Sequence, residues 1–161
     1  MSNKPKSVII CGGREFSEVD YPGLRKFLVK FLESQNVAEE ICGMAIGADM
    51  FGMDIAEQNM NIPVNKFYAD WDMTIPEFKD DPKSVINGYN KLAGINRNRR
   101  MATYAKHHNG ICVALPGGRG TKNMIQQAKE NNIPVYILSV KTIKTGDTHM
   151  HDINEYELIR G

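Results

Sequence analysis

Glycine-rich segments follow several apolar runs of the chain, and their composition suits the binding of an anion. "GGR" follows the apolar run at 7–11, and "PGGRGT" follows the run at 110–115. Glycines let backbone N–H groups converge on a ligand, and a helix that begins at such a turn adds free donors and a partial positive charge. The usual occupant is phosphate. The predicted phosphate-site residues are Gly12, Gly13, Arg14, Gly47, Pro116, Gly117, Gly118, Arg119, Gly120 and Thr121.

The glycine pattern differs from the two familiar nucleotide fingerprints. The chain contains no GxxxxGK[ST] segment, so a P-loop is not predicted. Neither "GGREFS" nor "GGRGT" fits GxGxxG, so a standard dinucleotide site is not predicted either. The alternative to a phosphate site is a set of tight turns in which glycine serves the backbone geometry alone.

Apolar runs alternate with amphipathic segments along most of the chain, which predicts an α/β fold. We expect a Rossmann-like parallel sheet with helices on both faces, in a single domain spanning 1–161. The core is expected over about 7–138, with a polar C-terminal extension at 139–161 whose place the pattern does not indicate. Asp20 is the expected N-cap of the first long helix, and Pro22 is expected in its first turn. The strands are expected at 7–11, within 39–47, at 62–68, 110–115 and 133–138, and the helices at 21–35, 48–61, 96–108 and 121–132.

Composition points to an ordinary globular protein of the cytoplasm. The 161 residues carry a formal charge of +1, which disfavours binding to nucleic acid because such proteins usually present a basic face. The three cysteines form no CxxC pair, and we expect buried free thiols in a reducing compartment. No apolar run is long enough to span a bilayer, and no secretory leader is recognisable. We therefore expect a cytoplasmic protein without a membrane partner.

Five segments occur in the order typical of the SLOG superfamily, and the chain most resembles its YspA-like branch. They are "VIICGGREF", "IGADMFGMDIAEQNMNIPV", "YADWD", "AGINRNRRM" and "VALPGGRGTKNMIQQAKENNIPV", and the resemblance covers about residues 7–138. Relatives by this resemblance are the LONELY GUY phosphoribohydrolases and DprA, a single-strand DNA binder. The resemblance implies that phosphate is bound by the "GGRGT" turn, with Gly12, Gly13 and Arg14 closing the site.

The same resemblance implies ligand contacts outside the glycine turns. LONELY GUY enzymes carry an arginine four residues before a methionine, and Arg97 and Met101 have this spacing. Asn98 and Arg100 could assist Arg97 in ligand binding. The alternative is that this basic run is a solvated helix face. Trp71 lies in the polar segment 69–95, an expected insertion or lid, and either stacks on a base or anchors that lid.

The chain departs from these relatives at the residue that carries their chemistry. Their PGGxGTxxE motif ends in a catalytic glutamate, and Met124 occupies that position. Methionine can neither activate water nor stabilise an oxocarbenium-like centre, so the mechanism does not transfer. A second departure is Ile46, where the YspA-like branch commonly has an arginine. Other carboxylates are candidates for catalysis, and Glu15 is the preferred one. Asp49 is a second candidate, although it could instead be an acidic residue that the dipole favours at a helix N-terminus. Asp70 and Asp72 are further candidates, although they could instead be solvated loop residues.

Two functions remain open from the sequence. The first is a sensor or sequestering protein for a nucleotide or a nucleotide-derived ligand. The alternative is an N-glycosidic hydrolase acting on nucleoside monophosphates or ADP-ribose-like compounds, and single-stranded nucleic-acid binding is the least favoured reading. A homo-oligomer is expected by resemblance, and no cofactor is expected. No metal site is predicted either, because "HMHD" at 149–152 has poor spacing for one.

Overall fold

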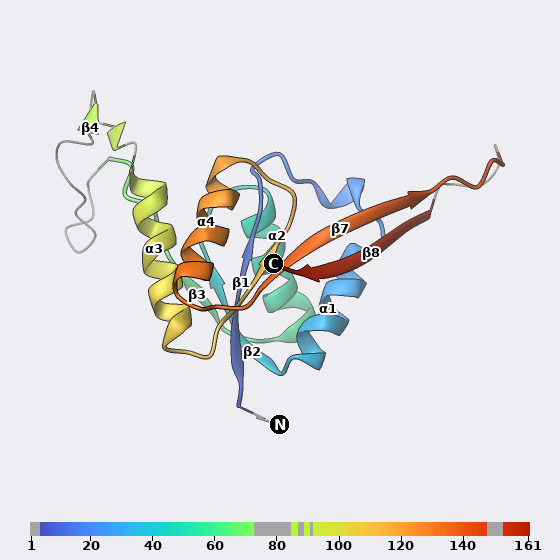
Figure 1. Cartoon of the computed structure of the whole chain (residues 1–161), viewed down its shortest axis with the longest axis horizontal. Coiled ribbons are helices and arrows are strands. Elements are labelled where there is room, and N and C mark those ends of the chain that lie inside the picture. Colours follow the sequence, from blue (N-terminus) through green and yellow to red (C-terminus); the bar gives the residue numbers. More distant parts are fainter. Residues whose placement is uncertain (1–3, 73–84, 87–88, 91, 148–152) are drawn as a thin grey trace.

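The computed structural model describes residues 4–72, 85–86, 89–90, 92–147 and 153–161, and it shows an α/β fold (Figure 1). A six-stranded sheet has the order β3-β2-β1-β6-β7-β8, in which the first five strands are parallel and β8 is antiparallel to β7. The two-residue strands β4 (Val85–Ile86) and β5 (Tyr89–Asn90) pair separately. The sheet strands are β1 (Lys6–Cys11), β2 (Val37–Cys42), β3 (Val64–Lys66), β6 (Ile111–Ala114), β7 (Val135–Ile143) and β8 (Ile153–Arg160).

Helices cover both faces of this sheet, as the sequence predicts. On one face, α1 and α2 pack against Val8 and Ile10 of β1. On the other face, α3 and α4 pack against Ile9 and Cys112. Successive residues of a strand point to opposite faces, which is why the buried stretch of β1 from Val8 to Cys11 is apolar on both faces. The helices are α1 (Leu24–Ser34), α2 (Ala48–Asp54), which continues as a π-helical segment (Ile55–Met60), α3 (Ala93–Lys106) and α4 (Arg119–Glu130).

The start of α1 differs from the sequence prediction. Asp20 is not its N-cap, because it belongs to a separate 3₁₀ turn (Glu18–Asp20) in which its own N–H donates to the Ser17 carbonyl at 3.1 Å. Pro22 also lies before the helix. The residue that precedes α1 is Gly23, whose φ of +81° is a left-handed conformation that glycine adopts without strain.

The C-terminal extension joins the sheet. β7 continues to Ile143, five residues beyond the predicted strand, and pairs with β8 from Tyr136 to Ile143. The outer parts of the two strands project from the body of the molecule as a two-stranded arm (Figure 1). Nearer the body, Tyr156 on β8 packs against Phe27 of α1 and donates a hydrogen bond to the Pro22 carbonyl at 2.8 Å. The extension therefore covers part of α1.

Glu40 is a buried carboxyl in the middle of β2. Its side chain is 0% exposed, and neither carboxyl oxygen has a hydrogen-bond partner of good geometry among the described residues. Burial raises its pKa well above the usual range, and the nearby charges of Asp49 and Glu57 add to the rise. The Ile10 amide opposes the rise only in part. Burial therefore favours the neutral form of Glu40 in the folded protein.

This burial makes folding stability depend on pH in a defined direction. The folded state keeps the Glu40 proton, whereas the unfolded chain releases it above the ordinary glutamate pKa of about 4.3. The contribution of protonated Glu40 to the free energy of unfolding is thus fully present below about pH 4.3, and it is lost as the pH rises towards the folded-state pKa of Glu40. We expect the difference in unfolding free energy between Glu40→Gln and wild type to shift in favour of the variant by at least about 1 kcal/mol when the pH is raised from about 5 to about 8. Urea unfolding at the two pH values measures this difference.

The matched control is Glu33→Gln, which removes an exposed carboxylate from α1. Its unfolding free energy should follow wild type across the same pH range. If Glu40→Gln and Glu33→Gln showed the same pH dependence, Glu40 would be ionised in the folded protein, and the account of its burial would be wrong.

Candidate functional site

Three turns meet at the carboxyl ends of β1 and β6, and their backbones contact one another directly. The Gly13 amide donates to the Pro116 carbonyl at 2.8 Å, and the Gly13 carbonyl accepts from the Ala48 amide at 3.1 Å. A Cβ on Gly12 would lie 2.5 Å from the Ala48 Cβ. β1 and β6 are also where the strand order reverses, which is the usual ligand-binding edge of an open α/β sheet.

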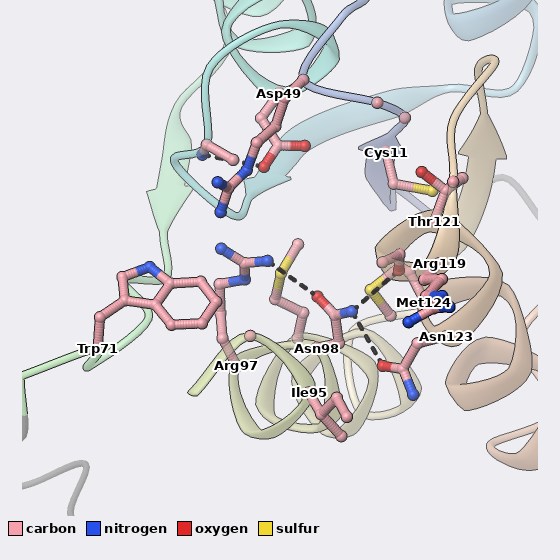
Figure 2. A pocket seen from close by; sticks show the side chains of 18 residues that line it. Cys11, Asp49, Trp71, Ile95, Arg97, Asn98, Arg119, Thr121, Asn123 and Met124 are labelled. Atoms are coloured by element: carbon pink, nitrogen blue, oxygen red, sulfur yellow. Dashed lines mark hydrogen bonds between the residues drawn. The ribbon is translucent and has the colours of Figure 1, made fainter. Parts of the chain in front are cut away.

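A cavity of about 480 Å³ opens beside these turns (Figure 2), a volume typical of small-molecule sites. Its walls come from the turns after β1, β2 and β6 and from one face each of α3 and α4. Sulfur atoms and apolar groups share its lining with three guanidinium groups and one carboxylate. The lining residues are Cys11, Gly12, Gly13, Arg14, Ala45, Asp49, Trp71, Gly94, Ile95, Arg97, Asn98, Met101, Gly118, Arg119, Gly120, Thr121, Asn123 and Met124.

The N-terminus of α4 opens into this cavity. Its first residue is Arg119, two residues earlier than the sequence predicts, so Gly120 and Thr121 belong to the first turn, where backbone N–H groups lack partners within the helix. The Thr121 side chain is nine-tenths buried, and its hydroxyl has no hydrogen-bond partner among the described residues. Asn98 holds this turn against α3 by donating to the Gly120 carbonyl at 3.2 Å and to Asn123 Oδ1 at 3.0 Å. The turn thus presents a fixed set of donors.

Arg97 and Asp49 enter the cavity from α3 and α2 (Figure 2). Arg97 donates through Nη1 to the Gly43 carbonyl at 3.0 Å, while its buried Nε has no partner among the described residues. Asp49 is 7% exposed, and its Oδ2 accepts from the Ala45 amide at 3.1 Å. Burial raises the Asp49 pKa, and the Ala45 amide and the charges of Arg97 and Arg14 limit the rise. Burial also lowers the Arg97 pKa from its very high ordinary value.

Trp71 closes one end of the cavity. The Arg14 guanidinium lies 5.7 Å from the centre of its ring, a cation–π distance. A Cβ on Gly94 would lie 3.0 Å from the Trp71 ring, so the glycine lets the indole pack closely on the start of α3. A second hollow of about 380 Å³ shares Arg14, Trp71 and Arg97 with the cavity and continues past Tyr68. An aromatic group could therefore extend from one hollow into the other.

Most of the predicted site residues come together at this cavity, and some lie beside it. Pro116 and Gly117 line a neighbouring shallow hollow, and Gly47 packs on the Gly13 and Arg14 carbonyl region of the turn. Glu15 also lines that shallow hollow, and so lies outside the main cavity. The remaining predicted residues, Gly12, Gly13, Arg14, Asp49, Trp71, Arg97, Asn98, Met101, Gly118, Arg119, Gly120 and Thr121, line the cavity itself.

The other carboxylates proposed from the sequence are absent from the cavity lining. Asp70 is buried in the loop before Trp71, and Asp72 is exposed. Cys11, Gly94 and Asn123 line the cavity without having been predicted. The spacing of Gly94, Asn98 and Met101 at i, i+4 and i+7 marks one face of a helix, and this signal could have found Gly94. Cys11, Cys42 and Cys112 are buried free thiols, as predicted.

No protein-family model matches the chain, and no match was found among curated proteins or solved structures. Within the described residues, no group of three or more His, Cys, Asp or Glu side chains is arranged to hold a metal ion. The "HMHD" segment at 149–152 lies outside the described residues, as do 73–84 of the expected lid. None of the helices in the described ranges has both the length and the apolar character needed to cross a bilayer.

The close contact between the turns predicts that a side chain at Gly117 destabilises the fold. A Cβ there would overlap the Thr121 hydroxyl and would lie 2.6 Å from the Gly13 amide nitrogen, a backbone atom that cannot move aside. We expect Gly117→Ala to lower the free energy of unfolding by about 1–3 kcal/mol in urea titration.

Gly120→Ala is the matched control, because a Cβ there meets no atom within 4 Å and alanine favours a helical position. Its stability should equal or slightly exceed that of wild type. Equal stabilities for the two variants would show that the turns do not pack as closely as described.

Proposed function

We propose that the chain binds a phosphate-bearing nucleotide or nucleotide-derived ligand, with the phosphate at the N-terminus of α4. One observation carries the proposal: the first turn of α4 opens into a cavity and brings with it the buried Thr121 hydroxyl, which has no hydrogen-bond partner in the described part of the chain. Backbone N–H groups at a helix N-terminus favour an anion through both hydrogen bonding and the helix dipole. Arg14, Arg97 and Arg119 add positive charge around the same space.

The charge balance of the cavity supports an anionic ligand. Among the described residues, the lining carries three guanidinium groups and one carboxylate, that of Asp49, whereas the whole chain has a formal charge of only +1. Trp71 and Tyr68 offer aromatic faces in the adjoining hollow. Such faces suit the base of a nucleotide, since bases stack on aromatic rings.

Within this proposal, the chain is a distant relative of the SLOG superfamily that binds its ligand without cleaving it. Met124 is 2% exposed and lines the cavity at the position where the resembling hydrolases carry glutamate. A thioether there cannot act as acid or base. We accordingly favour a sensor or sequestering protein. Its cytoplasmic location and its homo-oligomeric state stay predictions from the sequence.

A hydrolase remains the second candidate function because of Asp49. Its raised pKa and its place in the cavity suit a general base that activates water for attack on the anomeric carbon. The water proton would pass to Asp49, the C–N bond would break with its electron pair going to the departing base, and that base would take up a proton from Asp49 or from solvent. Glu15, which the sequence ranks first for this role, lies in the neighbouring hollow instead.

Removal of one cavity arginine tests the binding proposal. We expect Arg119→Ala to weaken binding of AMP, or of another nucleoside monophosphate that binds the wild type, about tenfold through loss of a charge-assisted hydrogen bond. Trp71 is the only tryptophan of the chain and lines the cavity, so a fluorescence titration reports on the site. Arg119 is exposed, so the melting temperature should not change.

Arg99→Ala is the control for charge. Arg99 is an exposed arginine on α3 that does not line the cavity, so its removal changes the net charge equally. We expect this variant to bind the nucleotide as wild type does. Equal weakening in both variants would mean that general electrostatics, and not the α4 turn, attracts the ligand.

Mass spectrometry after incubation with nucleoside monophosphates, NAD and ADP-ribose separates binding from cleavage. We expect every ligand to be recovered intact, because Met124 leaves the α4 side of the cavity without a carboxylate. Release of a free base by wild type, abolished in Asp49→Asn but not in Glu15→Gln, would contradict this expectation and establish the hydrolase.

A further inference from the structure

One wall of the cavity holds a buried acceptor and a buried donor that do not satisfy each other. Asp49 Oδ2 accepts from the Ala45 amide, and no ion pair within the described residues includes the Asp49 carboxylate. The Arg97 Nε has no partner among the described residues either. A buried polar group without a partner is costly, so a ligand that meets both needs gains affinity.

Gly43 lets these two groups approach the backbone closely. A Cβ at this position would lie 2.8 Å from Asp49 Oδ2 and 3.3 Å from Arg97 Nε. The two atoms are therefore near enough to each other for a single ligand atom to contact both. Asp49 and Arg97 also line the cavity (Figure 2).

The pairing of acceptor and donor selects the chemistry of the group that fits there. An alcohol donates one hydrogen bond and accepts others, so a single hydroxyl satisfies the carboxylate and Nε together. A phosphate oxygen only accepts, and the Asp49 carboxylate would repel its charge. An ammonium group only donates, and the Arg97 guanidinium would repel it in turn.

We propose that Asp49 and Arg97 together bind a sugar hydroxyl, so that the site takes ribose phosphates in preference to their deoxy analogues. The inference rests on the proposed function, because it assumes that the phosphate of the same ligand lies at the α4 turn. Asp49 is then a specificity residue. In a deoxy complex the Asp49 carboxylate keeps only the hydrogen bond from the Ala45 amide and the buried Arg97 Nε stays without a partner among the described residues, and this cost is the source of the discrimination.

Calorimetry with matched ligands tests the proposal. The probes are AMP, 2′-deoxy-AMP, 3′-deoxy-AMP, ribose 5-phosphate, 2-deoxyribose 5-phosphate and inorganic phosphate. The two pentose phosphates make the test independent of the base. We expect wild type to bind AMP at least about tenfold more tightly than the deoxy analogue that lacks the bridging hydroxyl.

Asp49→Ala should weaken AMP binding to the level of that deoxy analogue, while leaving the analogue and inorganic phosphate bound as in wild type. A merely structural role for Asp49 would weaken all of the probes together. Asp49→Asn serves as a second variant of nearly the same size, and Glu33→Ala controls for the lost charge on an exposed carboxylate. The ligand comparison on wild type needs no variant to fold.

The outcomes separate this inference from the proposed function. If AMP and ribose 5-phosphate bind wild type no better than any of their deoxy analogues, the hydroxyl inference is overturned and the phosphate proposal stands. If neither AMP, ribose 5-phosphate nor inorganic phosphate binds, both fall together. A ribose preference that persists unchanged in Asp49→Ala would remove Asp49 from the site.

Discussion

The backbone of Gly13 is the contact on which the site depends. Its amide donates to the Pro116 carbonyl and its carbonyl accepts from the Ala48 amide, so one residue joins the turns after β1 and β6 to the start of α2. Such close approach leaves no room for side chains. A Cβ on Gly13 would lie 3.0 Å from the Gly117 Cα. Gly12, Gly13 and Gly117 are therefore explained first by close packing between the turns, which in turn fixes where α4 begins.

The cavity follows from this arrangement. With α4 anchored beside β1, its N-terminus faces the space over the strand-order reversal, and α3 supplies the opposite wall through Arg97 and Asn98. A chain that is almost neutral overall thus concentrates guanidinium groups around one hollow. The buried Asp49 carboxylate gives the cavity two parts of different charge. The part beside the α4 turn attracts a phosphate, and the part beside Asp49 repels it. A ligand with an anionic end and a hydroxyl-bearing middle satisfies both regions.

Periodicity and glycine placement predict the α/β class, the two helical layers and most of the residues that line the cavity. They fail where tertiary contacts decide the outcome. The C-terminal extension has no strong pattern of its own, and β8 forms because the edge of β7 offers it partners along its whole length. Asp20 has the right residue type for an N-cap, yet it belongs to the 3₁₀ turn, and the residue that precedes α1 is Gly23. Adjacency to "GGR" in sequence likewise did not reveal which hollow Glu15 lines, and the catalytic roles proposed for Glu15 and Asp49 stay predictions.

The most direct test of the central claim is an amide NMR titration of ¹⁵N-labelled protein with AMP. If the phosphate binds at the N-terminus of α4, the largest shifts should fall on the amides of Gly118, Arg119, Gly120 and Thr121, with smaller shifts at Gly13 and Arg14. The absence of any shift, or shifts confined to the exposed arginine- and histidine-bearing face of α3 around Arg99 and His107, would contradict the account.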